Sequence, residues 1–174
     1  MPDWLPPILD FTGDWPAYEE KIYERFRDDL LRSHVRFRDV DVRVRSDPRV
    51  KGKEAGFWHA ISQGNEEVER TPDLVRCERI GWIRAMIECS DPALVRTWEN
   101  KRGTDRRALI ALPDFSYVVI LARRKGYDMF LTAYSVEKEH RRRKLEKEWK
   151  ENSRLENADA APKDGIGTPS THGR

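Results

Sequence analysis

The sequence lacks the features of a membrane or secreted protein. No stretch approaches the roughly 20 consecutive apolar residues of a membrane-spanning helix, and the first residues show neither the charged nor the apolar region of a secretory signal. Cys77 and Cys89 are the only cysteines, too few to complete a zinc site or a disulfide framework by themselves. We therefore expect a cytoplasmic protein with no membrane partner, in which both cysteines are small buried hydrophobic residues.

Motifs of several enzyme classes are also missing. The chain contains no glycine-rich dinucleotide loop, no Walker loop, no His-Glu-x-x-His motif and no Gly-x-Ser-x-Gly motif. Nothing in the sequence therefore predicts a nucleotide-dependent enzyme, a zinc protease or an α/β-hydrolase. We expect no cofactor, and no group of residues stands out as the ligand set of a catalytic metal.

Charged residues, in contrast, are abundant. Asp, Glu, Lys and Arg make up 37% of the 174 residues, yet the formal net charge is only +2. Basic residues outnumber acidic ones in two segments, 36–53 and 96–125. A locally basic surface can bind phosphate groups even when the whole chain is nearly neutral.

The length of the chain fits one ordinary domain. Residues 1–15, with their prolines and tryptophans, are expected to form an extended N-terminal arm. Residues 16–156 are expected to form a single α+β domain. Residues 157–174 are dominated by Ala, Pro, Gly, Ser and Thr and are expected to be a disordered tail.

Hydrophobic periodicity predicts three helices. One apolar stripe behind Pro16 has helical spacing: Tyr18, Ile22, Phe26 and Leu30. Thr71-Pro72 supplies a helix N-cap followed by a proline at the first helical position. The expected helices cover residues 16–32, 72–89 and 136–155, and the last of them is long and very highly charged.

Strand patterns dominate elsewhere. Residues 35–45 alternate as in a strand, with a parity change near Asp39 that we interpret as a β-bulge, and residues 46–72 are expected to be mostly loop. Later strands are predicted over Val95–Glu99, Arg106–Leu112, Phe115–Ala122 and Asp128–Tyr134. Because short turns force neighbouring strands to be antiparallel, the predicted fold is α+β, with an antiparallel sheet of four or five strands packed by helices.

The histidine of the run Phe57-Trp58-His59 is the first candidate for chemistry. An unperturbed imidazole titrates near physiological pH, which makes histidine the usual general acid or base. A basic segment, residues 49–53, leads directly into the run. The alternative is a half-buried histidine that packs beside two aromatic rings and makes a structural hydrogen bond.

Two basic clusters flank predicted hairpin turns. The first consists of Lys101, Arg102, Arg106 and Arg107, and the second of Arg123, Arg124 and Lys125. In an antiparallel meander both turns lie at the same end of the sheet, so the clusters should meet at one edge. Arginine forks there would match phosphate oxygens. The alternative is that these charges protect the sheet edge and keep the protein soluble.

The last predicted strand ends in a threonine and a tyrosine. Alternation places Thr132 and Tyr134 on one face, opposite Leu131 and Ala133. Two hydroxyl groups there could bind a scissile phosphate, or the Tyr134 ring could stack on a base. Both residues are also ordinary strand formers, which is the alternative reading.

The order of these features resembles the Barnase–EndoU–Colicin–RelE group of small metal-independent ribonucleases. Residues 56–150 are in particular similar to a bacterial and phage-related family of that type, in which a Phe-Trp-His segment precedes an arginine-rich helix. In that family a strand of the form Tyr-Val-Val-Ile-Leu-Ala, here Tyr117–Ala122, leads to Leu-Thr-Ala-Tyr, here residues 131–134. Residues 1–35 have no part in the resemblance.

The resemblance implies a RelE- or barnase-like fold and RNA cleavage by the substrate's own 2′-hydroxyl, which gives a 2′,3′-cyclic phosphate. It implies His59 as the early catalytic histidine, Arg79 and Arg106 as phosphate clamps, and Thr132 with Tyr134 as the late-strand pair. EndoU-like members pair two histidines, whereas this sequence has one that is well placed. The partner acid would then be Tyr134 or a basic residue, as in RelE-like members.

The predicted function is therefore a metal-independent endoribonuclease. A narrower version of this hypothesis is a toxin of a toxin–antitoxin or phage-related system. The predicted catalytic residues are His59, Arg106, Thr132 and Tyr134, and the predicted RNA-binding residues are Arg79, Lys101, Arg102, Arg123 and Arg124. The expected partners are RNA and an antitoxin protein. The alternative is a non-catalytic nucleic-acid-binding module or protein adaptor, and convergence of His59, Arg106 and Tyr134 on one pocket would favour the enzyme.

Overall fold

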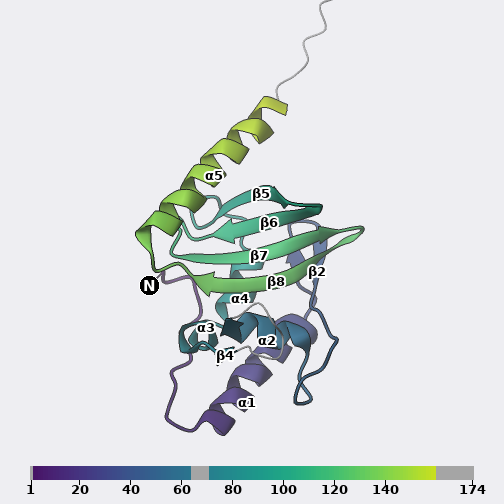
Figure 1. Ribbon diagram of the computed structural model, residues 1–174, viewed down its shortest axis with the longest axis vertical. Helices are drawn as coiled ribbons and strands as arrows, with labels where there is room; N and C mark the ends of the chain where they lie inside the picture. Colours follow the sequence, from purple (N-terminus) through teal and green to yellow (C-terminus); the bar gives the residue numbers. More distant parts are fainter. Residues whose placement is uncertain (1, 64–70, 160–174) are drawn as a thin grey trace, which may run out of the picture.

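The computed structural model describes residues 2–63 and 71–159. These residues form an α+β structure around one curled sheet with the strand order β1-β2-β8-β7-β6-β5 (Figure 1). The strands of this sheet are β1 (Arg36–Phe37), β2 (Val40–Arg43), β5 (Arg96–Arg102), β6 (Asp105–Ala111), β7 (Tyr117–Arg124) and β8 (Tyr127–Ser135). A separate small ladder pairs β3 (Ser62–Gln63) with β4 (Thr71–Pro72).

Helices lie on both faces of the sheet. They are α1 (Trp15–Phe26), α2 (Ala55–Ile61), α3 (Leu74–Glu78), α4 (Trp82–Glu88) and α5 (Glu139–Asp159), and α1 continues as a π-helical turn, η1 (Arg27–Leu31). Figure 1 shows α1–α4 on one side of the sheet and α5 on the other. Within the described ranges, no helix combines the length and the apolar composition needed to cross a membrane.

The four C-terminal strands form the predicted antiparallel meander. Each of the pairs β5–β6, β6–β7 and β7–β8 is antiparallel. The prediction of a purely antiparallel sheet of four or five strands is nevertheless wrong, because the sheet has six strands and β2 pairs parallel with β8 through Val42 and Asp128. A parallel pair needs a long connection, and here α2, α3, α4 and five strands, β3 to β7, lie between the two partners.

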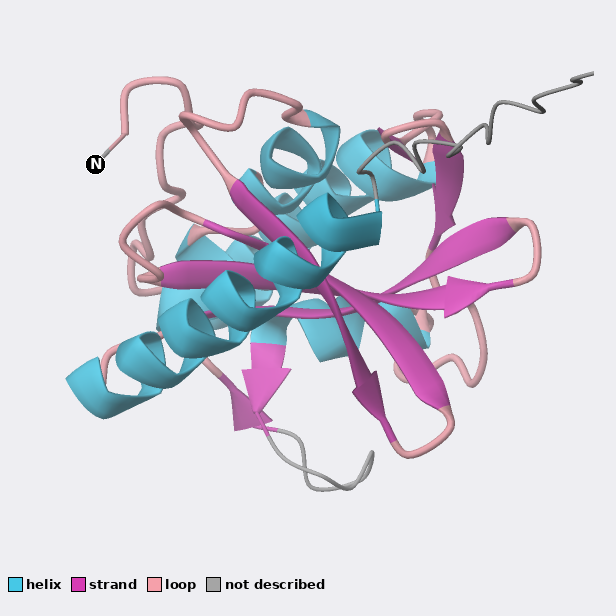
Figure 2. Ribbon diagram, turned by 90° about the horizontal axis from the view of Figure 1, so that it is seen from above, coloured by secondary structure: helices cyan, strands magenta, loops and turns pink. Residues whose placement is uncertain are grey.

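The parity change near Asp39 has a different cause from the predicted bulge. Phe37 pairs with Val40, so Arg38 and Asp39 form the turn of a hairpin between β1 and β2. Arg38 has a positive φ of 56°, as tight hairpin turns require. The side chain of Arg38 reaches the other end of the sheet, where Nη2 donates to Thr97 Oγ1 on β5 at 3.1 Å. Figure 2 shows the strong twist of the strands relative to one another.

Two helix predictions need correction. The expected helix over 72–89 is interrupted between α3 and α4, where Gly81 precedes α4. A Cβ atom on Gly81 would lie 3.1 Å from the Arg25 guanidinium, so α1 packs directly against this break. Residues 55–61 belong to a segment that was expected to be mostly loop around a short apolar run. They form α2, a helix in which every residue except His59 is buried. The helix over 16–32 and the long charged C-terminal helix are confirmed.

The sheet separates two hydrophobic clusters. Tyr117, Val119 and Leu121 of β7 point into the larger cluster, with α1, α2 and α4. Val118 and Ile120 point into the smaller one, where Leu145 and Trp149 of α5 cover the opposite face. Cys77 is buried, as predicted, and burial raises its pKa to about 12, whereas Cys89 is partly exposed. Helix α5 extends to Asp159, and the rest of the predicted tail lies outside the described residues.

Gly56→Ala is expected to destabilise the fold despite the better helix propensity of alanine. A Cβ atom at residue 56 would lie 2.1 Å from Val44 Cγ1 and 3.2 Å from the Arg45 carbonyl oxygen. Overpacking of this kind costs about 1–3 kcal/mol of unfolding free energy, measurable by urea denaturation. In a Val44→Ala background the methyl clash is removed, so the same substitution should cost much less. An equal cost in both backgrounds would contradict this account.

Candidate functional site

A polar cleft lies where α3, the end of β8 and the segment leading into α5 meet. It has a volume of about 170 Å³, and its walls include Asp73, Arg76, Tyr134 and Arg141. A larger cleft of about 620 Å³ adjoins it and shares four lining residues with it, Val75, Ser135, Val136 and Glu137. The two clefts therefore form one groove along the end of β8.

Arg76 organises the smaller cleft. Its Nη1 atom donates to the Ser62 carbonyl at 2.7 Å and to Thr132 Oγ1 at 3.3 Å. Its guanidinium carbon lies 5.5 Å from the centroid of the Tyr134 ring, within cation–π range. Asp73 forms a long ion pair with it, 3.9 Å from Nε, and the Arg76 side chain is 15% exposed. One largely shielded planar cation thus touches both Thr132 and Tyr134 of the last strand.

Local backbone features place these side chains. Asp73 is the N-cap of α3, where its carboxylate accepts the Arg76 backbone N–H at 3.3 Å. The Asp73 N–H donates to the Ile61 carbonyl at the end of α2. In β8 the register against β7 shifts between Phe130 and Thr132, which leaves Leu131 as an extra residue. Arg76 in the first turn of α3 is thereby held against the bulged part of β8.

The bulge changes the predicted faces of the last strand. Leu131 and Tyr134 both pack against the cluster under α5, while Ala133 lies in the cluster on the other face. Leu131 therefore shares a face with Tyr134, contrary to the simple alternation expected from the sequence. The prediction failed because a one-residue insertion reverses the parity of every later residue in a strand.

His59 lies next to this group, in α2. Its backbone carbonyl accepts a hydrogen bond from Thr132 Oγ1 at 3.4 Å. The residue is half-buried, and the Nε2 atom of its ring is buried. The hydroxyl of Thr132 therefore links α2 and the Arg76 side chain of α3 to β8. Arg76 thus contacts Thr132 and Tyr134, while His59 is joined to Thr132 through its backbone; neither His59 nor Thr132 is among the residues that line the cleft.

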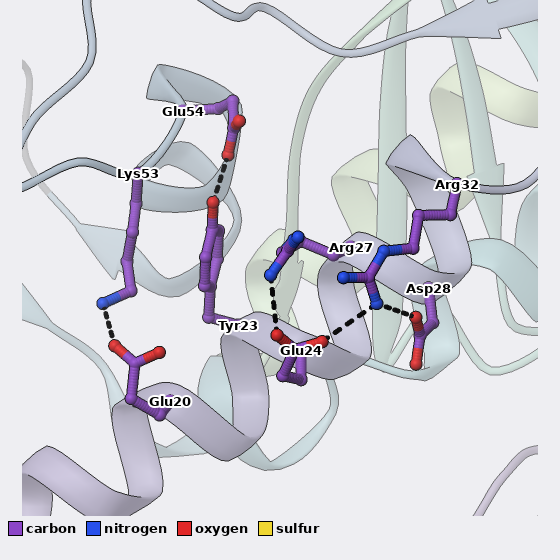
Figure 3. Close-up of polar contacts among 8 residues, drawn as sticks. All are labelled: Glu20, Tyr23, Glu24, Arg27, Asp28, Arg32, Lys53 and Glu54. Carbon is purple, nitrogen blue, oxygen red and sulfur yellow. Dashed lines mark hydrogen bonds and ion pairs between the residues drawn. The ribbon is translucent and has the colours of Figure 1, made fainter.

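Helix α2 is fixed in place by contacts with α1 (Figure 3). Just before α2, the Lys53 ammonium pairs with Glu20, and with Glu19 at 2.9 Å. Tyr23 Oη donates to Glu54 Oε2 at 2.8 Å. Lys53 and Glu54 are 8% and 6% exposed, and buried charges persist only when they are paired. The N-terminal helix, which has no part in the family resemblance, thus positions the segment that carries His59.

Glu54 should make stability dependent on pH. Burial raises its pKa, but the hydrogen bond from Tyr23 and the charge of Arg49 outweigh burial and hold the pKa below 4.5. A depressed pKa stabilises the fold above the unfolded value, and this contribution is lost as pH falls through the folded value. Unfolding free energy should therefore drop between about pH 5 and 3, and Glu54→Gln should flatten that drop. Glu24→Gln, on the exposed side of α1, is the control that should keep it.

Tyr134 is partly buried among cations. Burial raises the pKa of its phenol, and the positive charges of Arg102, Arg76 and Arg141 oppose this rise without cancelling it. Arg102 was predicted to bind RNA and is exposed on β5, whereas Arg141 lies in the first turn of α5. Three cations therefore act on one phenol at the cleft, as a site for an anionic ligand requires.

The larger cleft contains Arg79, the predicted phosphate clamp on the helix. Its guanidinium carbon lies 5.1 Å from the Trp82 ring centroid, and Nη1 donates to the Val75 carbonyl at 3.1 Å. Trp82 stacks edge-on against Tyr117, whose pKa is raised by burial, with Arg79 and Arg76 opposing. Arg79 is thus one helical turn from Arg76, in the adjoining part of the groove.

Arg106 and Arg123 lie in a different cleft, near the β1–β2 hairpin, that shares no lining residue with the Arg76 cleft. Both pair with Glu99, at 2.7 Å and 2.8 Å, and Arg123 also pairs with buried Asp128 at 2.6 Å. Burial opposes ionisation of Glu99, but the hydrogen bond from Arg106 and the charge of Arg123 keep its pKa low. These arginines are engaged in an ion-pair network.

The two predicted basic clusters do meet at one end of the sheet. The hairpin turns after Arg102 and after Arg124 lie side by side, and Arg124 Nη1 donates to Asp105 at 3.3 Å. Lys101 of β5 is exposed and lies opposite Arg106 of β6. Acidic residues interleave with the cations, so this end of the sheet carries mixed charge.

The sequence did not identify Arg76 or Asp73. The available signal was the helix start Thr71-Pro72-Asp73, because an N-cap at Asp73 places Arg76 in the first turn, facing the same way as the cap. Across residues 2–63 and 71–159, no group of three or more His, Cys, Asp and Glu side chains could hold a metal ion.

No protein-family model matches the chain, and no curated protein or solved structure is significantly similar to it.

Proposed function

We propose that the protein is a metal-independent endoribonuclease that binds a phosphodiester of RNA at the Arg76 cleft. The observation that carries this proposal is the contact of one shielded arginine with Thr132 and Tyr134, beside His59. An arginine fork matches phosphate oxygens. A cation that is largely shielded from water also stabilises a developing negative charge more strongly than an exposed cation does. The resemblance of the sequence motifs at residues 57–59, 117–122 and 131–134 to the Barnase–EndoU–Colicin–RelE ribonucleases supports this proposal.

The proposed reaction is an internal transesterification. The ribose 2′-oxygen attacks phosphorus, the bond to the 5′-oxygen of the next nucleotide breaks, and a 2′,3′-cyclic phosphate forms. A base removes the proton of the 2′-hydroxyl, and an acid protonates the leaving 5′-oxygen. In this proposal His59 carries out one of these proton transfers, and Tyr134 donates a hydrogen bond or a proton to the same phosphate. Arg76 neutralises the negative charge of the phosphorane.

The arginines of the groove have supporting roles in this proposal. Arg141 lines the same cleft as Arg76, and Arg79 lines the adjoining one. Both would bind phosphates next to the scissile one. Arg102 acts on the same site through its charge. Arg106, Arg123 and Arg124, which are paired with acidic residues, would contribute to RNA attraction rather than to the chemical step.

A cleavage assay with an RNA oligonucleotide of defined sequence tests the proposal. Products ending in a 2′,3′-cyclic phosphate are expected, with unchanged yield in excess chelator. An oligonucleotide with 2′-deoxyribose at the cleaved position should remain intact while it still binds. Cleavage of that oligonucleotide, or loss of cleavage in chelator, would contradict the internal transesterification. Growth arrest on induction in a heterologous host, relieved by a co-expressed antitoxin, would place the activity in a toxin–antitoxin system.

One observation favours a second candidate, a non-catalytic RNA-binding module. The Nε2 atom of His59 is buried, as in a histidine with a structural hydrogen bond. Binding of the same oligonucleotides without any product would identify this role, because the phosphate-binding arginines do not depend on proton transfer.

A further inference from the structure

An aromatic pocket lies beside the Arg76 cleft. It has a volume of about 440 Å³ and is lined by Phe11, Trp15, Lys51, Trp58, Pro72 and Leu74, together with Glu19. The segment 72–76 contributes residues to both sites. Pro72 and Leu74 line the pocket, whereas Asp73, Val75 and Arg76 line the cleft. Trp58 is likewise the chain neighbour of His59. The pocket and the proposed phosphate site are therefore adjacent, with residues 72–76 at the start of α3 between them.

The pocket is a concentration of exposed apolar surface. Phe11 and Leu74, which line it, are 37% and 44% exposed, and Val50 beside Lys51 is 39% exposed. These are three of the four large hydrophobic residues that the described chain exposes in this way; the fourth, Leu31, is in η1. Exposed apolar groups gathered in one hollow indicate a binding site, whereas scattered ones do not.

The rings are held rigidly and their polar atoms are already satisfied. Trp15 Nε1 donates to Glu19 at 3.0 Å, and Trp58 Nε1 donates to the Val50 carbonyl at 3.0 Å. Phe11 packs edge-on against Tyr18 at a centroid distance of 5.2 Å. The charge of Glu19 is balanced by Lys53 at 2.9 Å. The pocket thus offers fixed ring surfaces and few free donors, which suits stacking rather than hydrogen-bonded recognition.

Lys51 supplies a cation, although its backbone conformation is unfavourable for a lysine. It has a φ of +50° and is followed by Gly52 at +76°, in a two-residue turn closed by hydrogen bonds between Val50 and Lys53. Such turns prefer Asn-Gly, because a left-handed backbone is unfavourable for a lysine by roughly 1–2 kcal/mol. The Lys51 ammonium lies 5.7 Å from the Trp58 ring centroid. A strained position that points a cation over an aromatic ring is a mark of a functional site.

We infer that this pocket binds a base of single-stranded RNA next to the phosphate at Arg76, an inference that rests on the proposed function. Aromatic platforms with a nearby cation bind unpaired bases by stacking on the ring and attracting the adjoining phosphate. Residues 72–76 span at most about 14 Å even when fully extended, so one short oligonucleotide reaches both sites. Because stacking needs only a ring face, the pocket should accept all four bases with little preference.

The test uses an uncleavable 2′-O-methyl RNA of about ten nucleotides, within the usual site size for single strands, with binding to the full chain followed by fluorescence anisotropy. Phe11→Ala should weaken binding roughly 5- to 100-fold, the effect of losing one stacked base. Leu31→Ala is the matched control, because Leu31 is equally exposed, 37% in both cases, and should bind like the wild type. Lys51→Ala should weaken binding and reduce the salt dependence by about one phosphate contact.

A second probe separates the outcomes. An oligonucleotide with one abasic position at the stacked base should bind the wild type weakly and lose little more with Phe11→Ala, because both changes remove the same contact. A different result is that Phe11→Ala and Lys51→Ala bind like Leu31→Ala while Arg76→Ala binds weakly. This result would overturn the base pocket but leave the proposed function standing. The apolar surface would then be assigned to a protein partner. No binding by the wild type would overturn both.

Discussion

Arg76→Ala is expected to lower kcat/KM for RNA cleavage by about 10²–10³, the usual cost of removing one group that stabilises developing negative charge. The Arg76 side chain is only 15% exposed and contacts Thr132 and Tyr134. A phosphorane held there would be neutralised by a cation that water screens poorly. The measurement is a steady-state cleavage assay with an RNA of defined sequence.

Arg106→Ala is the matched control for this loss. The Arg106 side chain is 69% exposed and paired with Glu99 in the other cleft, so its removal should change the rate less than about tenfold. Arg76→Lys should recover only part of the activity, because lysine keeps the charge but not the planar fork. Melting temperatures must accompany the assay, since Arg76 also donates to the Ser62 carbonyl. Wild-type activity in a folded Arg76→Ala variant would remove Arg76 from the mechanism.

His59→Ala is expected to reduce kcat by about 10²–10⁴, the contribution of a positioned proton-transfer group, without unfolding the protein. The hydrogen bond from Thr132 goes to the backbone carbonyl of His59 and survives the substitution, so β8 and α2 should remain linked. His140→Ala, an exposed histidine of α5, is the control that should retain full activity.

Tyr134→Phe completes the comparison. Loss of activity shows that the phenol hydroxyl takes part in the reaction, whereas retained activity shows that the ring alone is used. If His59→Ala and Tyr134→Phe both cleave RNA like the wild type, the active site lies elsewhere in the molecule.

Features encoded by neighbouring residues were predictable from the sequence. The turn residues between β5, β6, β7 and β8 determine a meander without information from the rest of the chain. The apolar stripe of α1 likewise determines a helix wherever it packs. The strand predicted over residues 35–45, in contrast, was divided by a turn at Arg38, a residue without the glycine or asparagine that usually marks such turns. Its parallel partner β8 lies far along the chain, beyond any local pattern.

The candidate site was predictable to the extent that residue chemistry alone could identify it. His59, Thr132 and Tyr134 were chosen for their functional groups. In the fold Tyr134 lines the Arg76 cleft, Thr132 contacts Arg76, and His59 is joined to Thr132 through its backbone carbonyl. Arg106 and Arg123 were chosen because they belong to clusters of basic residues in the sequence. The register of the strands, however, places Glu99 and Asp128 beside them. Arg76 was missed because its value depends on the exact start of α3, which is set by the Asp73 cap.

The parallel pairing of β2 with β8 imposes an order on synthesis and folding. Translation produces β2 early, but its partner β8, which carries Thr132 and Tyr134, is made much later. The helices between them cannot bury their apolar faces against a complete sheet until then. A nascent or prematurely terminated chain would therefore have no assembled cleft. Under the proposed ribonuclease function, this delay would protect the message and the ribosome on which the chain is being made.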